Sequence, residues 1–181
     1  VKPAFASLTI GAGSCAWLLT HRDLSKSSTR IETAVAEART EFNDLCRSDQ
    51  DSAGSQMQPL MDTDSERLMA EGIATGVAGL ERLLSESGLS RGDFDRTVCH
   101  QVGSRHRIEM LKAMGLRIEN DSATFAKLGN TGSVALPLTL AAAQARGELV
   151  PGNQVAMLGI GSGINSVMLS AKWGQTPVSG N

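Results

Sequence analysis

The sequence is short of cysteine, of net positive charge and of long apolar runs, and each shortage excludes a class of protein. Its three cysteines, Cys15, Cys46 and Cys99, are widely spaced and form no CxxC pair. An odd, scattered set predicts neither a disulfide framework nor a zinc site, so we expect reduced thiols. A formal net charge of -2 argues against nucleic acid as a partner.

Two further absences concern membranes and targeting. No apolar run reaches the ~20 residues that a membrane-spanning helix needs, and none follows a basic start as in a signal peptide. We therefore expect a cytoplasmic protein. The 181 residues, of which 41% are hydrophobic and 20% charged, are enough for one domain with a real core, and they contain no internal repeat.

The first half of the sequence is the harder half to interpret. An apolar run at 6–19, broken by Gly11 and Gly13, predicts two short strands or one strand kinked at a close backbone approach. Such an opening strand usually pairs with something earlier, so we expect the C-terminal piece of a larger protein. Residues 31–46 leave helix and strand open, and residues 47–59 predict a polar surface loop.

The rest of the sequence alternates between helical and strand patterns. Residues 64–87 predict a long helix, capped by Asp64 or Ser65 and stopped by Gly88. Further helices are predicted at 104–114 and 133–145, strands at 94–100, 155–160 and 165–173, and a short extended piece at 123–125. This alternation predicts an α/β layered fold with a mixed, mainly parallel sheet.

The predicted helix at 133–145 carries no charge, and none occurs between Lys127 and Arg146. A helix resting on one face of a sheet normally shows a polar stripe to water, which this segment lacks. We therefore expect a buried central helix, with a second sheet or a partner chain on its far side.

Three stretches, in this order, resemble the C-terminal half of a thiolase-superfamily condensing enzyme of the β-ketoacyl-acyl-carrier-protein synthase III type. They are CHQVGSRH at 99–106, LGNTGSVALPLTL at 128–140 and VAMLGIGSGINSVMLSAKW at 155–173. The opening TIGAGSCAWLL resembles the family's glycine-bearing strand, which places residues 1–20 at the junction with the N-terminal half. The cysteine before His-Gln and the GNTGS motif look most like the head-to-head condensing enzymes of long-chain olefin biosynthesis.

The resemblance implies that residues 1–181 form half of a layered αβαβα thiolase-like fold. It implies Claisen condensation of coenzyme A or acyl-carrier-protein thioesters, without a metal or other cofactor. By motif, the catalytic histidine corresponds to His100 and the asparagine to Asn130. Two N–H donors aimed at one carbonyl oxygen stabilise its developing charge, each by roughly 3–4 kcal/mol. The turn of Gly161, Ser162 and Gly163 is expected to bring backbone N–H groups near the acyl carbonyl.

The family's nucleophilic cysteine lies in the N-terminal half, which this sequence does not contain. Cys15 falls on the glycine-bearing strand, and Cys99 should point away from the face of its neighbour His100, so neither is predicted to be the nucleophile. We expect a two-chain enzyme, a heterodimer that pairs further, whose other polypeptide carries the cysteine. The alternative is a non-catalytic structural half of such an enzyme.

Structural roles also remain open for individual residues. His100 fits a buried histidine bonded to a backbone carbonyl, and Asn130 fits a helix N-cap. His106 is predicted to be solvated on a basic helix, and its spacing from His100 is not that of a metal site. Arg105 and Arg107 fit either a solvated helix face or the steering of a phosphate-bearing thioester.

Overall fold

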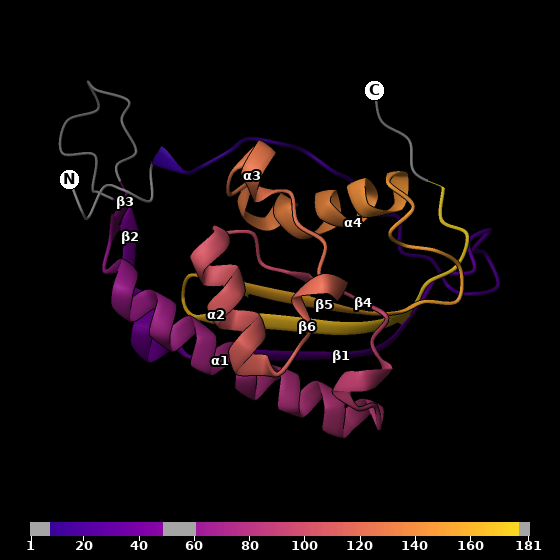
Figure 1. Ribbon diagram of the computed structural model, residues 1–181, viewed down its shortest axis with the longest axis horizontal. Coiled ribbons are helices and arrows are strands. Elements are labelled where there is room, and N and C mark those ends of the chain that lie inside the picture. Colours follow the sequence, from indigo (N-terminus) through magenta and orange to yellow (C-terminus); the bar gives the residue numbers. More distant parts are fainter. Residues whose placement is uncertain (1–7, 49–60, 178–181) are drawn as a thin grey trace.

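The computed structural model describes residues 8–48 and 61–177, which are built around a four-stranded sheet with helices on both faces (Figure 1). The strand order is β1-β6-β5-β4, formed by Arg30–Ala38, Asn165–Lys172, Gln154–Gly161 and Arg96–Cys99. A separate two-stranded ribbon pairs β2 (Cys46–Ser48) with β3 (Met61–Thr63). The predicted α/β class is confirmed.

The sheet is mixed, but parallel pairing does not dominate it. Only β4 and β5 are parallel, whereas β5 pairs antiparallel with β6, and β6 with β1. The expectation of a mainly parallel sheet is wrong for the described strands. The reason is the short turn after Gly161, which folds β6 straight back onto β5 as a hairpin, a connection that only antiparallel strands allow.

Helices cover the two faces of the sheet in pairs (Figure 1). α1 (Ser65–Ser87) and α2 (Ser104–Met114) lie on one face, and α3 (Phe125–Leu128) and α4 (Ala135–Ala145) lie on the other. Short 3₁₀ turns occur at Thr40–Leu45, Arg91–Asp93, Ile118–Asn120 and Gly132–Val134. The predicted limits of the long helix are confirmed, since Asp64 accepts the Arg67 N–H at 3.1 Å and Gly88 ends α1 at φ 71°.

Alternation along the central strands fills two cores, one on each face of the sheet. On β4, Cys99 enters the core shared with α1 and α2, while Val98 enters the core shared with α4. The other buried members of the α1/α2 core are Val35, Leu80, Leu83, Leu84, Phe94, Met110, Leu111, Met114, Leu116, Ala156, Leu158 and Met168. Those of the α4 core are Leu140, Ala143, Leu149, Val155, Met157, Ala171 and Trp173.

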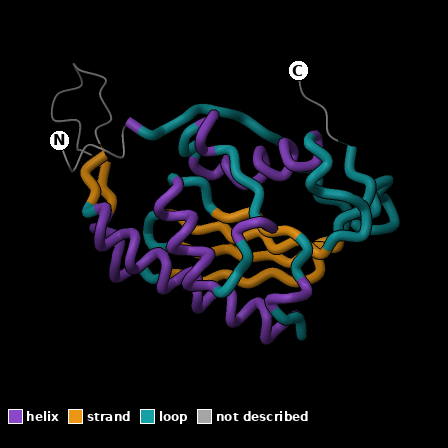
Figure 2. Tube along the Cα trace, in the orientation of Figure 1, coloured by secondary structure: helices purple, strands orange, loops and turns teal. Residues whose placement is uncertain are grey.

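The prediction of strands within 6–19 is wrong for the part that the structure describes. From residue 9 to residue 29 the chain consists of loops and turns, apart from one bridge between Ile10 and Asn130 (Figure 2). The side of β6 away from β5 is already occupied by β1, and the segment instead crosses α3 and α4 (Figure 1). It joins neither outer strand of the sheet, β1 or β4.

Three other segments can be compared with their predictions. Residues 31–46 contain both β1 and the 3₁₀ turn that follows it. The prediction of an extended piece at 123–125 is wrong. Gln101 accepts the backbone N–H groups of Thr124 and Phe125, and α3 begins at Phe125. Of the predicted loop at 47–59, Arg47 and Ser48 belong to β2, and the remainder lies outside the described residues.

The charge-free helix α4 is buried on the side that faces the sheet. Ala135, Thr139, Leu140 and Ala143 are buried, whereas residues 136–138 are half-buried. On that outer side the nearest described chain is the crossing loop, where a Cβ added to Gly13 would lie 3.6 Å from Val134 and 3.7 Å from Leu138. Burial on all sides is therefore not completed by the described residues.

Candidate active site

His100 follows the last residue of β4 and lies at the C-terminal edge of the sheet. Its backbone N–H donates to the carbonyl of Leu158 on β5 at 3.0 Å, which continues the strand pairing by one residue. Desolvation, with a smaller contribution from His106, lowers the pKa of His100 from 6.5 to about 4. At neutral pH the side chain is therefore an uncharged imidazole with one N–H to donate.

His106 lies close to His100, contrary to the prediction that it is solvated. The two ring centroids are 6.2 Å apart and the ring planes are perpendicular. The Nδ1 atom of His106 is buried and has no hydrogen-bond partner among the described residues, and burial lowers its pKa against the opposing effect of Glu109. The spacing of residues along one helix could not predict this pair. His100 follows strand β4, whereas His106 lies on α2, which the turn at 101–103 folds back beside that strand.

The turn formed by Gly161, Ser162 and Gly163 joins β5 to β6. Asn165 pairs with Gly161 across the hairpin, and its side-chain amide donates to the carbonyl of Ser162 at 3.2 Å. Gly163 has a φ of 137°, a conformation open to glycine but strained for other residues. Because β4 and β5 are parallel, this turn and His100 lie at the same edge of the sheet.

Asn130 lies between α3 and the 3₁₀ turn that leads into α4. Its side-chain oxygen accepts the backbone N–H of Gly132 at 3.0 Å, which orients the amide and leaves its NH2 group as a donor. Its backbone is held from the other side, since its N–H donates to Thr9 at 2.8 Å and its carbonyl accepts from Gly11 at 2.9 Å. The hydrogen bond of Asn130 to its own turn does not cap α4, which begins five residues later.

Two glycines allow the loop at 9–11 to approach Asn130. A Cβ added to Gly11 would lie 1.8 Å from the carbonyl oxygen of Leu128, and one added to Gly129 would lie 2.7 Å from that of Thr9. Gly129 also has a positive φ of 68°. The predicted close backbone approach is confirmed at Gly11, although the approaching segment is a loop and not a strand.

The three predicted parts of the site come from elements that end at one edge of the sheet. α4 precedes β5 and begins near its C-terminal end, since a Cβ added to Gly159 would lie 3.8 Å from Leu136 on the first turn of α4. Asn130 lies five residues before that helix, His100 directly follows β4, and the turn at Gly161 ends β5. His100 and the Gly161 turn thus lie at one edge of the sheet, and uncharged N–H donors can stabilise a developing oxyanion.

A buried polar network around Asp121 holds the last residues of β4. The Asp121 side chain is fully buried and accepts hydrogen bonds from Thr97 Oγ1 and the Cys99 N–H, each at 3.1 Å. It also pairs with Arg107, at 2.6 Å, although burial still raises the pKa of Asp121. Arg107 donates in addition to the carbonyls of Ile118 and Asp121. Arg107 is therefore part of the fold and not a solvated or steering residue.

The cysteines do not provide an activated thiol at this edge. Cys99 is buried in the α1/α2 core, and desolvation, reinforced by Asp121, raises the pKa of its thiol well above its ordinary value. Cys15 is exposed on the loop that crosses α4. A protonated thiol is a poor nucleophile, so Cys99 is unsuited to accepting an acyl group.

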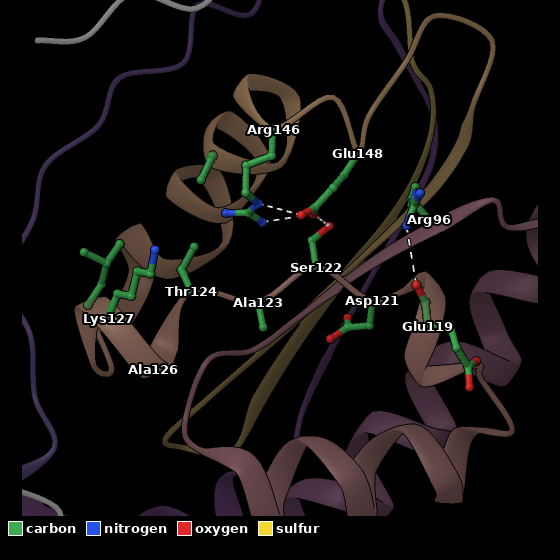
Figure 3. Close-up of a pocket in the computed structure, with 12 residues that line it drawn as sticks. Arg96, Glu119, Asp121, Ser122, Ala123, Thr124, Ala126, Lys127, Arg146 and Glu148 are labelled. Carbon is green, nitrogen blue, oxygen red and sulfur yellow. Dashed lines mark hydrogen bonds and ion pairs between the residues drawn. The ribbon is translucent and has the colours of Figure 1, made fainter.

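A groove of about 520 Å³ lies between the segment at 119–128 and the end of α4 (Figure 3). Arg146 and Glu148, both in its lining, form an ion pair, and Ser122 donates to Glu148 at 2.6 Å. Its lining residues are Arg96, Glu119, Asp121, Ser122, Ala123, Thr124, Ala126, Lys127, Leu128, Ala142, Arg146 and Glu148. His100, Asn130 and the Gly161 turn are not in this set, so the groove is a separate feature of the described chain.

Neither a metal-binding cluster nor a membrane-spanning helix occurs among the described residues. No group of three or more His, Cys, Asp or Glu side chains in the described ranges is placed to hold a metal ion. No helix within the same ranges is both long enough and apolar enough to cross a membrane.

Comparisons with known proteins place this architecture in a family. Residues 84–173 match the model of the C-terminal region of 3-oxoacyl-[acyl-carrier-protein] synthase III. The acyl-CoA:acyl-CoA alkyltransferase of Shewanella oneidensis is 34% identical over 174 residues, covering 94% of this chain and 50% of the relative. The enzyme of the same name from Xanthomonas campestris is 30% identical over 168 residues, covering 93% and 47%.

A solved structure gives the same result. The structure of Xanthomonas campestris OleA with bound lauric acid and lauroyl-CoA superposes with a TM-score of 0.80 at 27% identity, covering 95% of this chain and 49% of that one. The chain thus spans about half the length of the relatives that it matches. It belongs to the thiolase-like, β-ketoacyl synthase III-like family of condensing enzymes, and it carries the C-terminal domain of that fold.

Proposed function

We propose that this chain is the carbonyl-binding half of an acyl-thioester condensing enzyme, an acyltransferase that makes a β-keto product by Claisen condensation. In this proposal His100 and Asn130 donate hydrogen bonds to the carbonyl oxygen of one thioester. A cysteine on a separate N-terminal polypeptide holds the acyl group of the other. The reaction requires no metal or other cofactor from this chain.

The observation that carries the proposal is the uncharged imidazole of His100 at the C-terminal edge of β4. An imidazole whose pKa is about 4 keeps its N–H donor neutral throughout the physiological range and does not protonate a thiolate nearby. The amide of Asn130 is oriented by its own turn so that its NH2 group is the donor. Both groups suit an oxygen that gains negative charge during the reaction.

The reaction follows from these roles. The acyl group of the first thioester is transferred to the partner's cysteine, and the first coenzyme A or carrier thiol leaves. The α-carbon of the second thioester, after loss of a proton or of carbon dioxide, attacks the acyl-cysteine carbonyl. The new carbon–carbon bond forms as the cysteine thiolate leaves, while His100 and Asn130 hold the enolate-like oxygen of the second thioester.

The exposed apolar residues of the crossing loop support the proposal that a second polypeptide binds to this chain. Leu8, Leu18, Leu19 and Leu24 are 76%, 89%, 71% and 76% exposed. They belong to the segment that crosses α3 and α4 (Figure 1), and residues 136–138 of α4 are half-buried. Large exposed apolar patches mark interaction sites in proteins. In the proposal, this surface and α4 pack against the N-terminal half, and two such heterodimers associate into the complete enzyme.

The substrates are proposed to be acyl-coenzyme A thioesters. Two relatives that match more than nine-tenths of this chain carry the name acyl-CoA:acyl-CoA alkyltransferase, and OleA was crystallised with lauroyl-CoA. We therefore use lauroyl-CoA as the first substrate to test, with the matching acyl-carrier-protein thioester as its alternative.

The test separates the two half-reactions in the assembled enzyme. With His100→Ala, we expect intact mass to show normal acylation of the partner's cysteine by lauroyl-CoA, while formation of the β-keto product falls by at least 100-fold. Arg117→Ala is the control and should condense normally, because the side chain of Arg117 is 75% exposed and belongs neither to the site nor to the crossing loop. Normal condensation by His100→Ala would reject the catalytic assignment and favour a structural half.

A further inference from the structure

Gln101, the residue after His100, stands out as a buried side chain to which no function has yet been assigned. Its side chain is only 1% exposed, yet it carries a polar carboxamide. Burying such a group is unfavourable unless all of its hydrogen-bonding capacity is used. The partners that satisfy it therefore indicate why it is there.

The two ends of the carboxamide bond to different parts of the chain. The Nε2 group donates to the carbonyl of Cys99 at 2.6 Å, on the last residue of β4. The Oε1 atom accepts the backbone N–H groups of Thr124 at 2.9 Å and Phe125 at 3.3 Å. Gln101 thus connects the strand end that carries His100 to the first residues of α3.

From α3 the connection continues to Asn130. The helix has four residues, and the N–H of Gly129 donates to Phe125 at its end, immediately before Asn130. Thr124 is held on a second side, because its hydroxyl bonds that of Thr139 in the middle of α4 at 2.6 Å. A shift of Thr124 would therefore move α3 as a unit, and Asn130 with it.

We propose that Gln101 is a positioning residue that sets the relative placement of His100 and Asn130, so that both donors can reach one thioester oxygen. This inference rests on the proposed function. Gln101 itself touches no substrate in it and acts through the backbone on either side. Misplacement of a catalytic group by about 1 Å can reduce a rate by about 100-fold, so one buried amide is enough to matter.

The proposal predicts a selective loss in the assembled enzyme. Gln101→Met keeps the length and apolar volume of the side chain but removes the hydrogen bonds of its carboxamide, so the first turn of α3 loses its direct link to the end of β4. We expect acylation of the partner's cysteine by lauroyl-CoA to stay within twofold of the wild-type rate, while condensation falls by 10-fold to 100-fold. The KM for the second lauroyl-CoA should change less than kcat, because binding of the remote coenzyme A portion does not depend on Gln101.

Gln101→Glu is the second variant. It keeps an oxygen acceptor for the N–H groups of Thr124 and Phe125 but loses the donor to Cys99. If positioning is the role, this variant should condense faster than Gln101→Met and more slowly than the wild type. Should Gln101→Met fail to assemble, the same comparison of half-reactions is made with Gln101→Glu against the wild type.

A stability control tests whether the Gln101 variants lose activity only because the fold is less stable. Leu83→Ala opens a cavity in the α1/α2 core, away from both loops, and lowers Tm without touching the network. A Leu83→Ala enzyme with a Tm equal to or below that of Gln101→Met should condense at the wild-type rate at a temperature where both are folded. If the two variants lose condensation in parallel with Tm, Gln101 is only structural and the proposal is overturned.

The outcome also separates this inference from the proposed function. If His100→Ala abolishes condensation while the folded Gln101 variants condense normally, the positioning role fails and the catalytic assignment stands. If His100→Ala condenses normally, the proposed function fails regardless of Gln101. If His100→Ala and the Gln101 variants all acylate but condense slowly, both are supported.

Discussion

The low pKa of His100 makes a prediction about stability that does not depend on the enzyme's substrate. We consider His100→Gln, which keeps a polar side chain but removes the titrating group. The backbone N–H of residue 100 still donates to Leu158, so the pairing of β4 and β5 should be retained. The two proteins should then differ mainly in how their free energy of unfolding depends on pH.

The sign follows from which state binds more protons. Burial lowers the pKa of His100 in the folded state to about 4, whereas in the unfolded chain it should lie near 6.5. Between these two values the unfolded state binds the extra proton, so the free energy of unfolding rises with pH. One pKa unit corresponds to about 1.4 kcal/mol, so the full difference is on the order of 3 kcal/mol.

The assay is urea unfolding of the purified protein, followed by circular dichroism at several pH values from 4 to 8. We expect the free energy of unfolding of the wild type, relative to His100→Gln, to fall by about 3 kcal/mol as the pH drops from 7 to 4. Above pH 7 the two curves should be parallel. His21→Gln serves as the control, because an exposed histidine is solvated in both states. Parallel curves across the whole range would refute the argument that His100 is desolvated and uncharged in the folded state.

Two further predictions test the packing around the site, both by urea unfolding. Arg107→Met should lower the free energy of unfolding by about 3–5 kcal/mol, because it leaves the Asp121 carboxyl buried without its cation. Asp121→Asn should lower the free energy of unfolding less, because the Arg107 side chain is 20% exposed and can reach water. On α1, Gly79→Ala would place a Cβ 2.9 Å from Ser166 Oγ and should destabilise the protein by about 1–3 kcal/mol. Gly72→Ala meets no atom closer than 4.0 Å and should stabilise it by up to about 1 kcal/mol; equal effects of the two alanines would contradict the packing.

The elements that the sequence predicts correctly are those whose limits depend on local signals. Helix α1 has a capping aspartate at one end and a left-handed glycine at the other, and both act within a few residues. Strands β5 and β6 are long enough for their apolar pattern to be read. Strand β4, at Arg96–Cys99, lies within the strand predicted at 94–100 and ends directly before His100.

The features that the sequence could not predict depend on contacts between distant segments. The strand-like run at 9–19 is a loop that joins no strand of the sheet, and an apolar pattern contains no information about which neighbour a segment will find. α3 begins at Phe125 because Gln101, more than twenty residues earlier, accepts its N–H. The neighbourhood of His100 and His106 arises only once α2 has folded back beside β4.

The distribution of buried polar groups shows which parts of the fold must be held in one arrangement. Gln101, Asp121, Thr124 and Thr139 are all buried, and all are hydrogen-bonded between segments. Beneath α1, the buried hydroxyls of β6 at positions 166 and 170 have no partner among the described residues, and the core around them consists mainly of apolar side chains. Hydrogen bonds define distance and direction more strictly than apolar contacts, which tolerate rearrangement. These hydrogen bonds are concentrated between β4, α3 and α4. In the proposed function, His100 and Asn130 must lie at a fixed separation to bind one oxygen, and such hydrogen bonds would maintain it.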